Sequence, residues 1–179
     1  VDGLQKALPG VRTVNGAGVV RGCRMHKTPA EIALMQVAAD ITIAAFRDAS
    51  KRIKAGMTPA DINALIAGAT AQLGGKGGDA LILLGEASAY PHGSGKPQQV
   101  REGEVILLDG GCSVHGYVSD ISRSFVFGES TKRQRDVWAQ VRQGQQIAFE
   151  AAQLGKACGA VDDAVRGWYE KIGYGPGYR

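Results

Sequence analysis

Residues 104–127 read EVILLDGGCSVHGYVSDISRSFVF, and this stretch decides both the fold and the chemistry that we expect. Apolar strand-forming residues lead into Asp109-Gly110-Gly111, which is a turn signal. Residues 112–127 supply the strands that follow this turn and pair with the first strand. We therefore predict a β-hairpin that carries two carboxylates, Asp109 and Asp120, where strands seldom place Asp.

The faces of these strands indicate a cation site. Residues two apart in a strand share a face, so Asp109 lies with Leu107 and Asp120 lies with Val118. An ionised carboxylate that is buried among apolar side chains is costly unless a cation or hydrogen-bond donors offset it. Hard divalent cations bind carboxylate oxygens, so the pair predicts one or two metal ions. The alternative is that Asp109 belongs to a plain turn and Asp120 is an edge charge paired with Arg123.

Composition limits the class of protein. The chain has 179 residues, of which 44% are hydrophobic and 21% are charged, as in an ordinary globular domain. We expect no membrane-spanning segment, because no apolar run approaches the roughly 20 residues that a spanning helix needs. The net charge of +4 is scattered, so we expect no nucleic-acid partner. The three cysteines lack C-x-x-C spacing, which argues against a disulfide framework and favours a cytoplasmic protein.

Two helix starts carry the same signal, an N-cap Thr, a Pro at the first helical position and an acidic residue three positions after the cap. Thr28-Pro29-Ala30-Glu31 predicts a helix to about Ala55, and Thr58-Pro59-Ala60-Asp61 predicts a second helix that ends at Leu73. The predicted buried stripes are Ile32, Met35, Ala39, Thr42, Ile43 and Phe46 on the first helix, and Ile62, Leu65 and Ile66 on the second.

The remaining regular elements follow from local patterns. Residues 1–24 predict a short helix at 4–8 and a strand at 11–14, which would close an upstream unit. Residues 80–84 predict a strand of the β layer, and two further helices are expected at about 131–154 and 160–172.

The helical layout occurs twice, about 100 residues apart. A long helix, a glycine and a short helix recur, with Gly56 in the first copy and Gly155 in the second. The second copy lacks a sheet, so we expect strands after Arg179 to complete it. This predicts that half of a pseudo-symmetric domain lies outside the chain.

The motifs resemble those of a known family. Residues 107–112, LLDGGC, and 116–125, GYVSDISRSF, are similar in order and spacing to the first two metal-ligand motifs of the pita-bread metallopeptidases, especially the prolidase and aminopeptidase P branch. The likeness extends to the helix at Pro29 and to Ala89-Tyr90-Pro91-His92-Gly93, where that family carries a substrate-site His.

This resemblance implies an α+β fold, the pita-bread (creatinase/aminopeptidase) fold, with an antiparallel β layer and flanking helices. Residues 25–179 would form the N-terminal half of the catalytic domain, and residues 1–24 the tail of an N-terminal creatinase-like domain and linker. By the resemblance, Asp109 chelates one metal, Asp120 bridges two, and His92 contacts the substrate or the tetrahedral intermediate. The ions would be Mn²⁺, Co²⁺ or Zn²⁺.

The implied activity is hydrolysis of peptides or dipeptides with proline in the second position. A two-metal site of this kind lowers the pKa of bound water toward about 7 and clamps the carbonyl that is attacked. We expect an Xaa-Pro dipeptidase that forms a homodimer. The alternatives are an aminopeptidase P, a non-catalytic pita-bread scaffold, a metal-free creatinase-like hydrolase and, less favoured, a methionine aminopeptidase.

The resemblance also implies ligands that the chain lacks. A His and two Glu would belong to the repeat that follows residues 173–179. We expect a truncated or nicked piece of the enzyme, with the C-terminal half possible as a separate chain, and we expect the isolated piece to bind metal weakly and to hydrolyse nothing.

Overall fold

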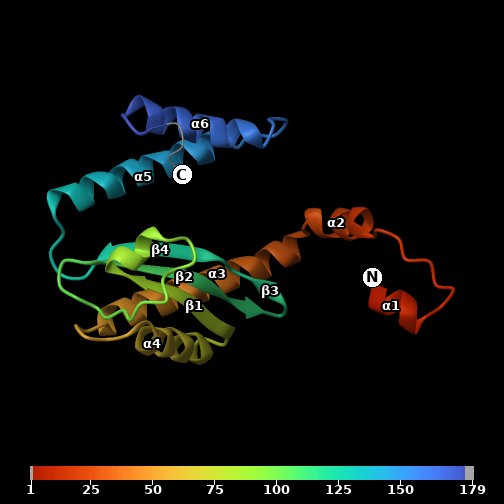
Figure 1. Ribbon diagram of the computed structural model, residues 1–179, viewed down its shortest axis with the longest axis horizontal. Coiled ribbons are helices and arrows are strands. Elements are labelled where there is room, and N and C mark those ends of the chain that lie inside the picture. The colour runs from red at the N-terminus through yellow and green to blue at the C-terminus, as the bar shows by residue number, and fades with distance from the viewer. Residues whose placement is uncertain (1, 176–179) are drawn as a thin grey trace. The chain divides into compact units, whose positions relative to one another are not determined.

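The computed structural model describes residues 2–175 (Figure 1). The chain forms two compact units, Val1–Val100 with Ile106–Phe125, and Arg101–Val105 with Val126–Arg179. Its elements in chain order are α1 (Asp2–Ala7), α2 (Ala17–Met25), α3 (Pro29–Arg52), α4 (Pro59–Gln72), β1 (Lys76–Leu84), the 3₁₀ helix η1 (Gly85–Ala89), β2 (Val105–Val114), β3 (Tyr117–Val118), β4 (Ile121–Val126), α5 (Lys132–Ala151) and α6 (Gly159–Lys171).

Capping boxes start α3 and α4, as the sequence predicts. The Glu31 backbone N–H donates to the Thr28 hydroxyl at 3.3 Å, and the Thr28 backbone N–H donates to the Glu31 carboxylate at 2.6 Å. Thr58 and Asp61 repeat this exchange at 3.3 and 2.8 Å. Each box satisfies backbone donors that the first turn of a helix leaves without partners.

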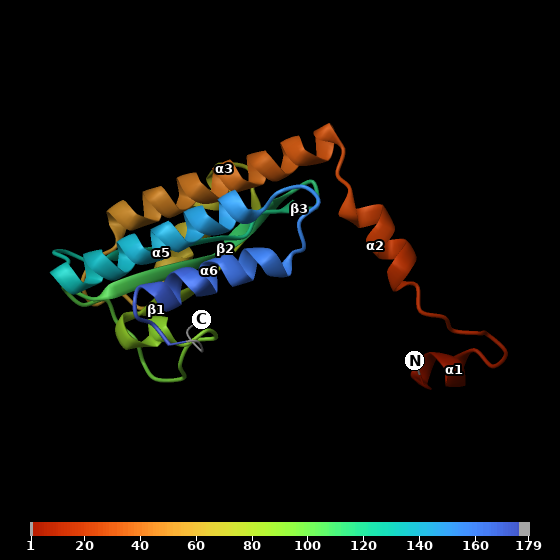
Figure 2. The same cartoon turned by 90° about the horizontal axis from the view of Figure 1, so that it is seen from above.

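The first unit is built around an antiparallel sheet in which β2 is the central strand. β2 pairs with β1 along one edge and with β3 and β4 along the other. Alternate residues of β1 and β2 are at most 4% exposed: Ile82, Leu84, Ile106, Leu108 and Cys112. The helices α3 and α4 contact this face, and α3 runs along the strands in both views (Figures 1 and 2).

The buried side of α3 differs from the predicted stripe. Thr42 and Phe46 are buried as predicted, but Ile32 and Met35 are 56% and 37% exposed. The residues that contact the core are mainly small, with Ala38, Ala45 and Ala49 fully buried. Apolar periodicity marks the larger side chains, whereas close approach of a helix to a sheet depends on the small ones. On α4, Ile62 and Ile66 are buried as predicted, and Leu65 is half-buried.

Length and composition alone would allow α3 to cross a membrane. It has 24 residues, and its most apolar window has a mean hydropathy of 1.3. Core helices of compact units meet the same criterion. α3 packs against α4, and its Thr42 hydroxyl donates a hydrogen bond to Cys112 of the sheet.

The N-terminal residues correct two expectations. The short helix is present as α1, but residues 11–14 form no strand. A lone β-prone segment gains nothing from extension without a partner strand. The sequence does not predict the helix α2, because Gly18 and Gly22 lower the helix propensity of its residues.

The second unit repeats the helical layout of the first. α5 starts with a capping box at Thr131 and packs against α6, and the Tyr174 hydroxyl donates to Gln140 at 2.7 Å. The glycines that follow the long helices, Gly56 and Gly155, have φ of +84° and +80°. Both positions therefore need a residue that adopts the left-handed conformation without strain.

The start of α3 is tied to the β2–β3 hairpin, and this contact gives a pH-dependent prediction. The Tyr117 hydroxyl donates to Glu31 at 2.6 Å and, with the Thr28 donors, lowers the pKa of Glu31 to about 2. A carboxyl with a depressed folded-state pKa stabilises the fold above its unfolded pKa, and this contribution is lost as the pH falls toward the folded-state value.

We expect Tyr117→Phe to raise the pKa of Glu31, and to shrink the acid range over which stability is lost. The shift is read from the Glu31 side-chain carboxyl carbon in an NMR titration. Asp61, whose pKa is lowered by Thr58 alone, serves as an internal reference and should not move. An unchanged Glu31 titration would show that the tyrosine hydrogen bond is not formed in solution.

Candidate metal centre

Asp109 lies inside a continuous strand, so the predicted turn at Asp109-Gly110-Gly111 is wrong. β2 runs through these residues to Val114, and neither glycine has a positive φ. The chain reverses instead at His115 and Gly116, whose φ values are +48° and +86°. Two positive φ values in a two-residue loop fit the twist of a tight hairpin.

The glycine pair is required by close approach of the neighbouring chain. A Cβ at Gly110 would lie 2.5 Å from the Asp79 carbonyl oxygen, and a Cβ at Gly111 would lie 1.8 Å from the Ser119 carbonyl oxygen. Both distances are far below van der Waals contact, so no side chain fits at either position. The two glycines let β1 and the segment between β3 and β4 approach β2 beside Asp109.

The register places Ser122 beside Asp109, and Asp120 lies two residues before Ser122. Asp109 is paired with Leu81 of β1, and on its other side the Ser122 hydroxyl donates to Asp109 Oδ1 at 2.5 Å. The antiparallel register that pairs Ser113 with Val118, followed four residues further along the chain, sets Ser122 opposite Asp109. Asp120 is two residues before Ser122, in the short segment between β3 and β4.

The burial of these carboxylates differs from the sequence argument. Asp109 is half-buried and Asp120 is exposed, although both were expected to be enclosed by apolar side chains. The reason is that α3 and α4 cover the opposite face of the sheet. On the face of Asp109, Leu81 and Val118 are 38% and 65% exposed.

The predicted His92 lies in a turn that packs on this same face. The Gly93 N–H donates to the Tyr90 carbonyl at 3.0 Å, with Pro91 and His92 between them. Pro in the second position and Gly in the fourth are typical of a type I turn. A Cβ at Gly93 would lie 2.7 Å from Leu83 Cδ2, and Leu83 follows the partner of Asp109 by two residues. His92 itself is exposed.

The loop that carries His92 is anchored at its far end. The Leu84 N–H donates to Gln98 Oε1 at 2.9 Å, which ties the loop to the end of β1. Val100 is buried and exchanges backbone hydrogen bonds with Gly56 and Met57 at 2.9 and 2.8 Å. These contacts fix where the His92 turn meets the sheet.

A buried polar cluster holds the chain just before Asp120. The hydroxyls of Thr42 and Ser119 are 2.8 Å apart, and the Cys112 backbone N–H donates to Ser119 Oγ at 3.0 Å. Thr42 is 2% exposed and Cys112 is 4% exposed. The cluster therefore connects α3 to the backbone that positions Asp120. Sequence reasoning did not assign a role to Ser119 or Ser122.

The non-metal alternative for the two acids finds no support in residues 2–175. Asp109 is not in a turn, and no ion pair joins Asp120 to Arg123, whose guanidinium donates to the Ser122 carbonyl at 2.8 Å. Carboxylate oxygens suit a hard divalent cation. No group of three or more His, Cys, Asp or Glu that could hold a metal occurs in the described part of the chain. Two carboxylates supply only part of the oxygen ligands that a divalent cation takes.

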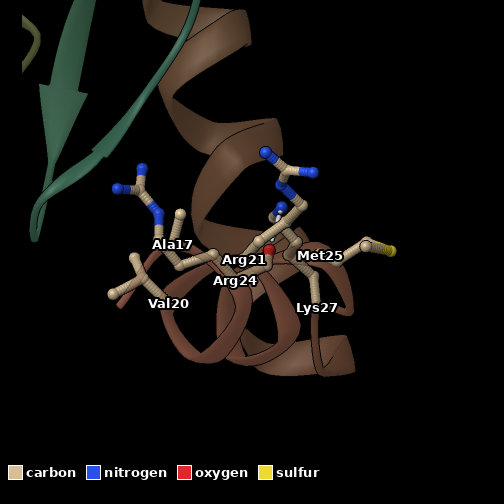
Figure 3. Close-up of a pocket in the computed structure, with 6 residues that line it drawn as sticks. All are labelled: Ala17, Val20, Arg21, Arg24, Met25 and Lys27. Carbon is tan, nitrogen blue, oxygen red and sulfur yellow. Dashed lines mark hydrogen bonds between the residues drawn. The ribbon is translucent and has the colours of Figure 1, made fainter. Parts of the chain in front are cut away.

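A separate pocket of about 560 Å³ lies on α2 and is shown in Figure 3. Its lining is apolar and cationic: Ala17, Val20, Arg21, Arg24, Met25 and Lys27. It contains none of the predicted site residues, and it has no carboxylate or imidazole that could bind a metal ion.

Comparison with known proteins gives one family. Residues 33–179 match the model of metallopeptidase family M24. The chain is 29% identical to the Xaa-Pro dipeptidase of Pyrococcus furiosus over 159 residues, which are 88% of this chain and 46% of that protein. It is 32% identical to the Xaa-Pro dipeptidase of Lactobacillus helveticus over 158 residues, which are 85% of this chain and 42% of that protein.

Solved structures of the same kind share the fold. The X-Pro aminopeptidase of Thermotoga maritima superposes with a TM-score of 0.86 at 29% identity, covering 97% of this chain and 50% of that one. The prolidase of Pyrococcus furiosus gives 0.80 at 27% identity, covering 88% and 48%. The predicted fold is confirmed, and the chain spans about half the length of the relatives it matches.

The glycine pair provides a test of the site's geometry. We expect Gly111→Ala to lower the free energy of unfolding by about 2 kcal/mol, as overpacking typically does, because the new methyl group meets the Ser119 carbonyl. Urea denaturation measures this loss. Gly95→Ala is the matched control, since its Cβ would enter open space. Equal stability of the two variants would contradict the close approach at Ser119.

Proposed function

The chain belongs to metallopeptidase family M24, and from this membership we propose that it is part of a metal-dependent peptidase that hydrolyses the bond between an N-terminal residue and proline. The observation that carries the proposal is the hydrogen bond from Ser122 of β4 to Asp109 of β2, because Asp120 precedes Ser122 by only two residues and the His92 turn packs beside β1. The relatives named Xaa-Pro dipeptidase support the substrate class.

Each residue has a defined task in this proposal. Asp109 would bind one divalent ion and Asp120 would bind both, each through its carboxylate oxygens. A two-ion centre supplies Lewis-acid activation of water and of the scissile carbonyl. His92, on its anchored turn beside β1, donates a hydrogen bond to the substrate carbonyl or to the tetrahedral intermediate.

The rest of the centre is proposed from the resemblance. A His and two Glu complete the ligand set, and they belong to the half of the relatives that this chain does not span. The ions are Mn²⁺, Co²⁺ or Zn²⁺. The whole enzyme is a cytoplasmic homodimer, and its other half is either continuous with this chain or a separate polypeptide.

An Xaa-Pro aminopeptidase that accepts longer peptides is the second candidate. The structural match to the Thermotoga maritima X-Pro aminopeptidase favours it. Rates on an Xaa-Pro dipeptide and on a longer peptide with the same first two residues separate the two functions.

The residues of this chain alone should bind metal weakly. Two carboxylates leave most coordination positions of each ion to water, so we expect a dissociation constant for Mn²⁺ on the order of millimolar, as for the weakest carboxylate sites. We also expect no hydrolysis of an Xaa-Pro dipeptide. Isothermal titration and a dipeptide assay measure both, and tight binding or turnover would show that the centre is complete within residues 1–179.

In the complete enzyme, we expect Asp120→Ala to reduce hydrolysis of an Xaa-Pro dipeptide to the background rate, because a bridging carboxylate serves both ions. The circular dichroism spectrum should remain that of the wild type, since Asp120 is exposed and outside the core. Asp48→Ala, which removes an exposed carboxylate on α3, is the control. Retained activity of the Asp120 variant would remove this residue from the metal shell.

A further inference from the structure

We propose that Ser122 is a positioning residue that orients the Asp109 carboxylate for a divalent cation. This inference rests on the proposed function of Asp109 as a metal ligand. Its basis is the hydrogen bond of 2.5 Å from the Ser122 hydroxyl to Asp109 Oδ1, across the pair formed by β2 and β4.

The hydrogen bond fixes one oxygen and leaves the other available. An ionised carboxylate has about four lone-pair sites on two oxygens, and one hydroxyl donor occupies one of them. The donor sets the rotation of the carboxylate plane, so Oδ2 keeps one direction before any cation arrives. Hydrogen bonds to metal-binding carboxylates act in this way in known metal sites.

The charge of Asp109 is not neutralised by this contact. Within residues 2–175, no ion pair involves Asp109, and the nearby Arg123 guanidinium donates to the Ser122 carbonyl at 2.8 Å. Here a neutral hydroxyl holds the group in place and leaves its negative charge for a metal ion.

The contact is specific to one serine of the strand. Ser124 is two residues further along β4 and also exposed, yet its side chain makes no hydrogen bond within residues 2–175. Ser122 differs because the register sets it opposite Asp109. Ser124 is therefore a matched control with the same residue type, strand and exposure.

The experiment measures Mn²⁺ binding by the chain of residues 1–179, with the free ion followed by electron paramagnetic resonance, which detects weak binding. We expect Ser122→Ala to raise the dissociation constant about tenfold, the lower end of the usual effect of such partners. Ser122→Thr keeps the hydroxyl and should bind as the wild type does, and Ser124→Ala should also be unchanged.

Structural damage is separated from positioning by two further measurements. Circular dichroism and the urea midpoint should be the same for the wild type, Ser122→Ala and Ser124→Ala, since both serines are exposed. The chemical shift of the Asp109 carboxyl carbon, without metal, should change in Ser122→Ala and remain in Ser122→Thr.

The outcomes that overturn the proposal are distinct from those that overturn the proposed function. If Ser122→Ala binds Mn²⁺ within twofold of the wild type, or if Ser124→Ala loses as much affinity, Ser122 is not a positioning residue. If Asp109→Ala leaves Mn²⁺ binding unchanged, Asp109 is not a ligand and the metal centre itself is wrong. Loss of binding in Asp109→Ala with none in Ser122→Ala refutes only the role of the serine.

Discussion

The close approach of three chain segments at Gly110 and Gly111 is the constraint on which the rest of the site depends. On one side the β1 backbone at Asp79 leaves no room for a Cβ, and on the other the Ser119 carbonyl leaves none. At Gly110 and Gly111, β2 is therefore in direct backbone contact with a neighbouring segment on each side. Asp109 is the residue before this pair, so its position follows from the backbone more than from its own contacts.

The polar cluster of Thr42, Cys112 and Ser119 links this constrained backbone to α3. Thr42 is buried, and its hydroxyl contacts both the Ala38 carbonyl, at 3.1 Å, and Ser119. A buried hydroxyl without a partner costs about 1–3 kcal/mol, so the paired arrangement is strongly preferred over a shifted one. The helix thus fixes Ser119, and Ser119 fixes the backbone of its neighbour Asp120.

The sequence predicts those features that depend on local chemistry. The capping boxes at Thr28 and Thr58 satisfy backbone donors within one turn, and they mark both helix starts correctly. The motif around Asp109 identifies the family, but its glycines were assigned to a turn. Gly-Gly is locally ambiguous between turning and close approach, and only the β1 backbone and Ser119 decide between them. The role of Ser122 needs the register, which local patterns do not contain.

The solvent accessibility of the two acids follows from how the sheet is covered. Ionised carboxylates are expensive to bury, and opposite α3 and α4 Asp120 stays exposed while Asp109 is only half-buried. The helices supply most of the apolar core, and on the face of Asp109 the buried Leu83 adds to it beneath the His92 turn.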